Sequence, residues 1–140
     1  MNAMKIKVLI TDDHPMFRRA LRCFLELDAA IEIVGEASSG EQACSMARDS
    51  LAHVVCVDWR MAKMDGVETV RRLIAATPDI KIIALSAGFE EGIEAAMLAA
   101  GASTYINKEQ ITEQLLPAIH ALFSQREVTL AAPHAIGTAA

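Results

Sequence analysis

Short runs rich in Val and Ile alternate along the chain with longer amphipathic segments. Five runs have the length and β-branched content of strands, and we predict strands over residues 5–10, 31–34, 54–57, 81–85 and 104–106. In the segments between and after them, apolar residues recur three and four positions apart, which is typical of helices that bury one face. The pattern therefore predicts five strand–helix units in series.

Prolines and glycines mark expected helix ends. Pro15 stands where a first helical turn tolerates it, and Gly101 is a stop after the fourth helix. Pro117 falls inside the fifth helical pattern, where a proline costs about 3 kcal/mol, so we expect that helix to begin late or to be kinked there. Periodicity ends at Gln125. We predict one domain over residues 1–124 and a mobile tail or truncated linker over 125–140.

Serial strand–helix units predict a doubly wound α/β domain. Each strand that returns parallel to its predecessor needs a right-handed crossover, and the crossover helices cover both faces of the sheet. The run 54–57 is apolar without alternation, as expected of a central strand covered on both sides. We therefore expect a five-stranded parallel sheet with five helices.

Composition and charge exclude several classes of protein. The 140 residues suit one domain, and 53% of them are hydrophobic, which argues against disorder. Only 4% are aromatic, so the core must be aliphatic. The net charge of −5 gives no electrostatic drive toward nucleic acid. No apolar stretch approaches the roughly 20 residues of a membrane span, and no export signal is visible, so we expect a cytoplasmic protein.

The cysteines and histidines have no metal-ligand spacing. Cys23, Cys44 and Cys56 are odd in number and form no C-x-x-C pair, so we expect small buried thiols rather than disulfides or zinc ligands. We interpret His14 as a helix-start residue rather than a catalytic base. The other histidines, at positions 53, 120 and 134, we expect on the surface.

Polar residues directly follow four of the predicted strands. In an open parallel sheet the carboxyl ends of the strands meet at one edge, where ligands bind. We therefore expect three carboxylates, a hydroxyl and an ammonium to lie close together at this edge, although the residues that carry them are far apart in the sequence. The residues, in strand order, are Thr11, Asp12 and Asp13, then Asp58, then Ser86, then Asn107 and Lys108.

This set of groups favours a divalent metal and phosphoryl chemistry. Crowded carboxylates raise one another's pKa unless a cation intervenes, and Mg2+ binds one or two carboxylates together with water and phosphate oxygens. A carboxylate beside the metal can attack phosphorus and form an aspartyl phosphate. The metal, Lys108 and the hydroxyl of Ser86 could then neutralise charge on the transferred oxygens.

Each residue also has an ordinary structural interpretation when taken alone. Asp12 and Asp13 could be turn or N-cap residues, and Asp65 with Gly66 is a turn dipeptide. Ser86 could cap a helix, and a lysine after a strand is more often a solvated surface residue. It is the coincidence of polar groups at four strand ends that favours a site.

Four segments, taken in order, carry a resemblance to a known family. They are VLITDDHP over 8–15, VDWRM over 57–61 with MDG over 64–66, LSA over 85–87, and GASTYINK over 101–108. Together they resemble the receiver domain of bacterial two-component response regulators over roughly residues 5–124, and DDHP and GASTY are most similar to the NarL/FixJ (LuxR-type) subfamily. The resemblance implies the flavodoxin-like receiver fold, with strand order 2-1-3-4-5.

The resemblance also implies roles for the acidic residues. Asp58 would accept a phosphoryl group from a sensor histidine kinase. Mg2+ would be held by Asp13, Asp58 and the backbone carbonyl of Arg60, with Asp12 helping through water. The chain would be a phosphoacceptor signalling domain rather than an enzyme proper, with limited autophosphorylation from small donors and autodephosphorylation.

The remaining roles concern the switch that phosphorylation operates. Lys108 would pair with the phosphoryl group, Ser86 would move toward it, and Tyr105 would change rotamer with that movement. The added charge would reshape the outer face of the last two helices. Ala62 and Glu109 depart from the family, which commonly has Pro at both positions, so we expect a less rigid loop after Asp58 and no cis X–Pro bond at 109.

The output is open. The subfamily usually carries a C-terminal helix-turn-helix, and the sixteen residues after Ser124 are too few for one. Either the chain is a stand-alone receiver acting through protein–protein contacts or a phosphorelay, or it belongs to a longer transcription regulator that binds DNA through a domain not present here. A homodimer formed on phosphorylation is a further expectation.

Two other functions are weaker hypotheses. A magnesium-dependent phosphohydrolase commonly has a second acid two residues after its nucleophile, where this chain has Arg60. A nucleotide- or flavin-binding domain is disfavoured because neither G-x-G-x-x-G nor a P-loop motif is present.

Overall fold

A single parallel sheet forms the centre of the computed structural model, which describes residues 4–88 and 90–131, with side-chain surroundings through residue 125. The strand order is β2-β1-β3-β4-β5, and every neighbouring pair is parallel. The strands are β1 (Ile6–Thr11), β2 (Ile31–Ala37), β3 (Val54–Asp58), β4 (Lys81–Ser86) and β5 (Thr104–Asn107). The predicted fold class and strand order are confirmed.

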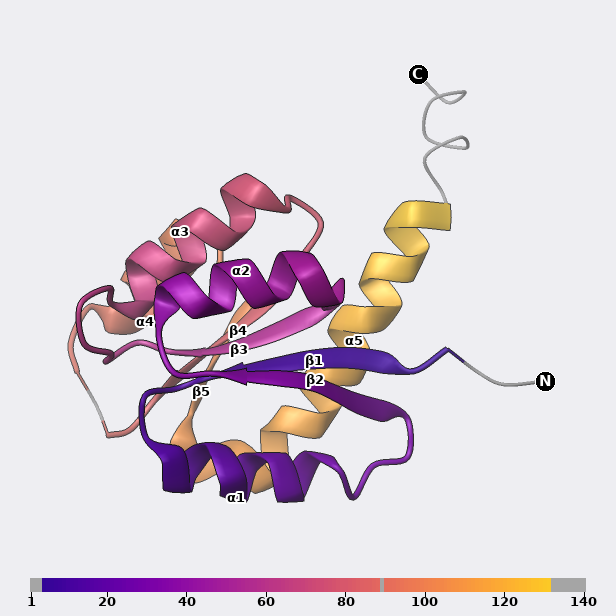
Figure 1. The fold of residues 1–140 in the computed structure, drawn as a ribbon, viewed down its shortest axis with the longest axis horizontal. Helices are drawn as coiled ribbons and strands as arrows, with labels where there is room; N and C mark the ends of the chain where they lie inside the picture. The colour runs from indigo at the N-terminus through magenta and orange to yellow at the C-terminus, as the bar shows by residue number, and fades with distance from the viewer. Residues whose placement is uncertain (1–3, 89, 132–140) are drawn as a thin grey trace.

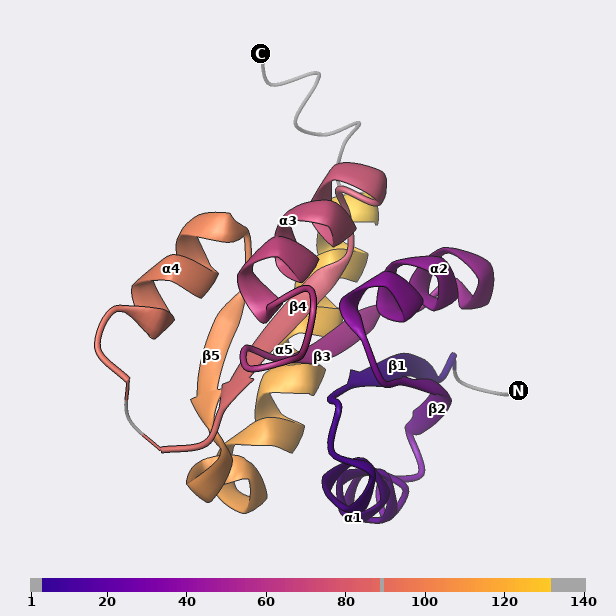
Figure 2. The ribbon, with the colours of Figure 1, turned by 60° about the vertical axis from the view of Figure 1, so that its left-hand side comes forward.

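Helices cover both faces of this sheet (Figure 1). Helices α1 and α5 pack on one face and α2, α3 and α4 on the other, so the domain has three layers, as Figure 2 also shows. The helices are α1 (Pro15–Leu25), α2 (Gly40–Ser50), α3 (Gly66–Ala76), α4 (Ile93–Ala100) and α5 (Ile111–Ala131), with a short 3-10 helix, η1 (Lys108–Gln110), before α5.

The two faces of the sheet are built from alternate residues of the same strands. In β3, Val54 and Cys56 pack toward α1 and α5, whereas Val55 and Val57 pack toward α2, α3 and α4. All four side chains are fully buried. This arrangement explains why the central strand is apolar without alternation. The first face is lined mainly by Ile, Leu and Phe, and the second contains more Ala and Met.

Strand β2 runs on to Ala37, past its predicted end. Pairing with β1 continues through Gly35 and Glu36, after a register shift beside Val8 and Leu9 that leaves one residue of β2 without a partner. Gly35 also faces α2, because a Cβ there would lie 2.4 Å from Met46 Cε. A glycine and a glutamate weaken a strand pattern in the sequence, and pairing with a neighbour overrides that preference.

Helix α5 differs from its prediction at both ends. It begins at Ile111, well before Pro117, so a late start is wrong. Leu115 and Ile119, on either side of the proline, are fully buried, and their burial stabilises a helix that contains it. The helix continues to Ala131, past the predicted boundary at 124, because no glycine or proline interrupts residues 125–131. The predicted tail over 132–140 lies outside the described residues.

The dipeptide at the start of α3 fixes that helix against β3. Asp65 is the N-cap residue, and its Oδ1 accepts a hydrogen bond of 2.9 Å from Glu68 N–H. Gly66 follows, and a Cβ there would lie 2.5 Å from Trp59 Cα and 2.7 Å from the carbonyl oxygen of Asp58. Only glycine allows so close an approach, so this turn dipeptide holds the first turn of α3 under the end of β3.

Two sequence predictions about burial are wrong. Cys23 is exposed, because it lies on the outer side of α1, whereas Cys56 is buried and burial raises its pKa to about 12. His53 is buried rather than on the surface. Its Nδ1 accepts a hydrogen bond of 2.9 Å from Lys7 N–H, and its ring lies 5.0 Å from that of Phe123.

None of the helices in the described part of the chain combines the length and apolar character needed to cross a membrane.

Candidate functional site

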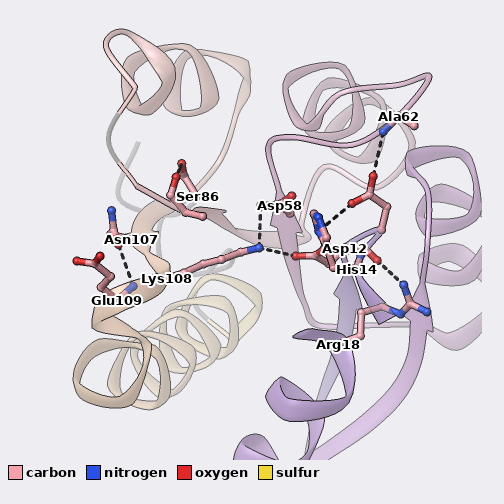
Figure 3. A network of polar contacts seen from close by, with 11 residues as sticks. Asp12, His14, Arg18, Asp58, Ala62, Ser86, Asn107, Lys108 and Glu109 are labelled. Atoms are coloured by element: carbon pink, nitrogen blue, oxygen red, sulfur yellow. Dashed lines mark hydrogen bonds and ion pairs between the residues drawn. The ribbon is translucent and has the colours of Figure 1, made fainter. Parts of the chain in front are cut away.

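The polar residues at the strand ends meet at one edge of the sheet (Figure 3). Asp12 and Asp13 follow β1, Asp58 is the last residue of β3, and Lys108 follows β5. Carboxylate oxygens of the three aspartates and a ring nitrogen of His14 all lie within 4.8 Å of one another. Asp12 and Asp58 are buried, and Asp13 is half-buried. The topology thus brings these residues together although they are far apart in the sequence.

Lys108 supplies a cation to two of these carboxylates. Its Nζ lies 2.7 Å from Asp12 Oδ2 and 3.2 Å from Asp58 Oδ1. It also lies 3.9 Å from the ring centre of Phe17 in α1, which is a cation–π contact. Only 14% of the Lys108 side chain is exposed. A solvated surface position for this lysine is therefore wrong, and Phe17 of α1 also borders the site.

The position of Lys108 is fixed by the turn that carries it. Asn107 Oδ1 accepts a hydrogen bond of 2.8 Å from Glu109 N–H, and Asn107 Nδ2 donates one of 2.8 Å to the carbonyl of Gly88. A proline at 109 would lack the N–H, so this bond depends on the departure from the family pattern. The two bonds tie the end of β5 to the loop after β4.

The surroundings of Asp58 disfavour its negative charge. Its pKa is raised to about 6, mainly by burial and next by the nearby charge of Asp12, while Lys108 acts in the opposite direction. The three carboxylates exceed the one lysine by two negative charges. Such a site gains from a bound cation, which would replace the water that burial removes and balance the remaining charge.

Asp13 has one oxygen held by the protein and one without a hydrogen bond. Its Oδ2 accepts from Ala62 N–H at 3.2 Å, across the loop after β3. Its Oδ1 is buried and has no hydrogen-bond partner among the described residues. A buried carboxylate oxygen that makes no hydrogen bond, although His14 Nδ1 lies 3.0 Å away, fits a hard divalent cation such as Mg2+ inside this cluster of three carboxylates.

The loop after β3 extends away from this cluster. The guanidinium of Arg60 pairs with Glu90 in the loop after β4 and lies 5.8 Å from the ring centre of Trp59. Its side chain is largely exposed. This ion pair connects the loop after β3 with the loop after β4.

Ser86 and Tyr105 lie beside the acidic cluster rather than in it. Ser86 ends β4 and is fully buried, and its Oγ lies 3.5 Å from the carbonyl of Ala87, at the limit of a hydrogen bond. Tyr105 is half-buried in β5, packs with the α2–α4 side of the core, and lines a groove with Glu90 and Leu98. The two residues thus lie on neighbouring strands, with Ser86 at the carboxyl edge of the sheet and Tyr105 two residues before the end of β5, where it pairs with Ala84.

Three further contacts at the site were not predicted from the sequence. Arg18 Nη1 donates a hydrogen bond of 2.6 Å to the backbone carbonyl of Asp12, and Ala62 N–H binds Asp13 as described. The Nδ1 of His14 lies 2.9 Å from Asp12 Oδ1, although the residue is also the N-cap of α1, as the sequence suggested. A hydrophobic pattern does not show which backbone N–H groups donate to a site or where the ring of His14 points. The sequence does show that His14 directly follows Asp12 and Asp13.

Comparisons with known proteins agree on one family. The model of the response regulator receiver domain matches residues 8–120. The response regulator UvrY of Escherichia coli K12 is 36% identical over 119 residues, which are 85% of this chain and 55% of UvrY. The transcriptional regulatory protein DegU of Brevibacillus brevis is 34% identical over 118 residues, 84% of this chain and 50% of DegU. The chain thus spans about half the length of the curated relatives it matches.

A solved structure gives the same result. The signal receiver domain of the response regulator NarL from Mycobacterium tuberculosis superposes with a TM-score of 0.76 at 28% identity, and the match covers 84% of this chain and 98% of that one.

Proposed function

The chain belongs to the response regulator receiver domains, in the subfamily of the NarL- and LuxR-type regulators, and from this membership we propose that it is a switch operated by phosphorylation of Asp58. It is a signalling domain and not a member of a classical enzyme family. The observation that carries the proposal is the buried carboxylate of Asp58 between two further aspartates and Lys108. In the proposed reaction a carboxylate oxygen of Asp58 attacks the phosphorus of a phosphohistidine. An O–P bond forms, the P–N bond breaks, and the imidazole of the sensor histidine kinase leaves.

A magnesium ion suits the donor set of this site. Asp13 and Asp58 would hold it, with the backbone carbonyl of Arg60 as a third ligand and Asp12 acting through water. Bound there, Mg2+ would neutralise charge on the phosphoryl oxygens and on the carboxylates. The unpartnered Oδ1 of Asp13 supports this assignment.

The chain's own residues hold Asp58 ready for the reaction. Lys108 orients the carboxylate through its contact at 3.2 Å, and its ammonium is near enough to bind an oxygen of the incoming phosphoryl group. Burial excludes water from the Asp58 oxygens and raises the pKa of the acid to about 6, so most molecules carry the nucleophilic carboxylate at neutral pH. Reaction with small donors, and slow loss of the phosphoryl group to water, follow from the same geometry.

Ser86 and Tyr105 would transmit the change. A phosphoryl group adds about 1.5–2 negative charges and three acceptor oxygens. The hydroxyl of Ser86 makes only one long contact, to Ala87, so little opposes its turning toward the new acceptor. Tyr105, half-buried on the adjacent strand, would then change rotamer and alter the surface formed by α4, β5 and α5.

The output and its setting are part of the proposal. UvrY and DegU are named as regulators, and this chain matches about half of each, so we propose control of transcription through a DNA-binding domain outside this chain. A sensor histidine kinase is the proposed phosphoryl donor, and the cytoplasm is the proposed location of this chain. A homodimer formed on phosphorylation is the proposed intermediate step.

Intact mass spectrometry tests the phosphoryl transfer. The protein is incubated with acetyl phosphate and MgCl2 at neutral pH and should gain the mass of one phosphoryl group. Asp58→Asn should gain none, and Asp49→Asn, a matched change at an exposed acid of α2, should behave as the wild type. EDTA should abolish the gain. No gain in the wild type, or a gain that persists in Asp58→Asn, would contradict the proposal.

A further inference from the structure

The imidazole of His14 lies between the two carboxylates of the acidic pair. Its Nδ1 is 2.9 Å from Asp12 Oδ1 (Figure 3) and 3.0 Å from Asp13 Oδ1. In an octahedral site with bonds of about 2.1 Å, neighbouring ligand atoms lie about 3 Å apart. The ring nitrogen therefore already has the spacing of a neighbouring ligand to both oxygens. One potential ligand atom from each of Asp12, Asp13, His14 and Asp58 lies within 4.8 Å of the others.

The other oxygen of each carboxylate is engaged elsewhere. Asp12 Oδ2 accepts from Lys108 Nζ at 2.7 Å, and Asp13 Oδ2 accepts from Ala62 N–H at 3.2 Å. The two Oδ1 atoms are thus the ones presented to His14. Asp12 Oδ1 is hydrogen-bonded to the ring, whereas Asp13 Oδ1 is buried and has no hydrogen bond among the described residues. One ring nitrogen therefore does not satisfy both carboxylate oxygens. An ion bound by His14 Nδ1 and the two Oδ1 atoms would satisfy them both.

The backbone holds His14 in this position. Its N–H donates to Asp12 Oδ1 at 2.8 Å, and its carbonyl accepts from Arg18 N–H at 3.0 Å as α1 begins. Pro15 follows at the first position of the helix and restricts the chain further. The ring itself is 65% exposed. An ion from solvent can therefore reach the nitrogen without unfolding any element.

We propose that His14 Nδ1 is a ligand in the metal site and that it shifts the preference of the site from Mg2+ toward ions that favour imidazole, such as Zn2+. This inference rests on the metal site of the proposed function. An all-oxygen site suits Mg2+, whereas an imidazole nitrogen adds affinity for Zn2+, Fe2+ or Ni2+ and little for Mg2+. The neutral ring donates to Asp12 through Nδ1–H; when the ion binds, the proton leaves Nδ1 and the ring takes the tautomer protonated at Nε2, so the Nδ1 lone pair bonds to the ion.

Calorimetric titration with ZnCl2 and with MgCl2 tests the proposal. All proteins carry Cys23→Ser, because this exposed thiol is itself a zinc ligand. His14→Ala should weaken Zn2+ binding at least about tenfold and change Mg2+ binding less than about twofold. His120→Ala, which removes a histidine of α5 outside the site, should change neither. In nitrogen-15 NMR spectra, the Nδ1 resonance of His14 should shift on addition of Zn2+.

The outcomes separate this inference from the proposed function. Equal weakening of both ions in His14→Ala, no weakening of either, tighter Mg2+ binding, or an unshifted Nδ1 resonance would overturn the role of His14. Binding that is lost in Asp13→Asn but kept in His14→Ala would overturn that role alone and leave the metal site standing. Failure of the wild type to bind either ion would overturn both.

Discussion

Strand β3 joins two regions that make opposite contributions to stability. Residues 54–57 and Asp58 are all buried in one continuous strand. The first four are apolar and pack against helices on both faces, whereas Asp58 places a carboxylate beside two others with one lysine for compensation. The interior stabilises the fold, whereas burial and the neighbouring carboxylate disfavour the charge of Asp58 at the carboxyl edge of the sheet. Burial alone therefore does not distinguish the core from the site, whereas the charge of the buried group does.

The largest expected effect lies in the interior. Leu115 on α5 is fully buried against the sheet, and Leu115→Ala should lower the free energy of unfolding by about 2–5 kcal/mol, because it removes apolar contacts and leaves a cavity. Urea denaturation at neutral pH measures the change. Leu27→Ala, at an 82% exposed position, should change it by less than about 0.5 kcal/mol. Similar changes in the free energy of unfolding for the two variants would contradict the stabilising role of the buried interior.

The next largest change in stability is expected at Asp58 and has the opposite sign. Asp58→Asn should raise the free energy of unfolding by about 2–3 kcal/mol at pH 7 without divalent ions, because it removes a buried charge and the repulsion from Asp12. Urea denaturation in EDTA measures the change. Asp49→Asn, at an exposed acid, is the control. An Asn variant less stable than the wild type would show that Asp58 is compensated as it stands.

The same variant has a defined pH dependence. The pKa of Asp58 is raised from 3.8 to about 6 in the folded protein, so the folded state holds the proton more tightly than the unfolded state. The stability of the wild type relative to Asp58→Asn therefore falls as pH rises from about 4 to about 6 and is constant above that. Below about pH 4 the advantage of Asn should vanish. An advantage that grows toward low pH would contradict the raised pKa.

The smallest effect concerns the rim of the site. Ala62→Pro removes the N–H that binds Asp13 and should lower the free energy of unfolding by about 0.5–1 kcal/mol, since water can partly replace the donor at this half-buried acid. Thermal unfolding without divalent ions measures it. Glu109→Pro, which removes the N–H bound to Asn107, should cost a similar amount. An Ala62→Pro variant as stable as the wild type would show that this donor contributes nothing.

Most of the fold was predictable because the periodicity of apolar residues and the buried faces coincide. The predicted strands differ from the observed ones mainly at their ends, where Thr11, Asp58, Ser86 and Asn107 are polar yet still paired in the sheet. The exceptions depend on contacts outside the local pattern. Pairing with β1 extends β2 through Gly35, and packing against the sheet maintains α5 across Pro117, which local preference disfavours.

The candidate site was predictable in its residues but not in its contacts. Strand-end topology placed Asp12, Asp13, Asp58 and Lys108 at one edge, and the structure brings them together. The roles of these residues, and those of Ser86 and Tyr105, remain predictions. The position of His14 against the acidic pair depends on how α1 begins, and no periodicity encodes that.

The close approach at Gly66 has a mechanical consequence. The first residue of α3 touches the backbone of Asp58 and Trp59 with no room for a methyl group, and a Cβ there would also lie 3.0 Å from Met97 Cε of α4. A close-packed junction of this kind has no slack to absorb a displacement. We therefore expect a movement of the strand end around Asp58 to displace the start of α3, which packs directly against it. Glycine at this position therefore couples the end of β3 directly to the first turn of α3.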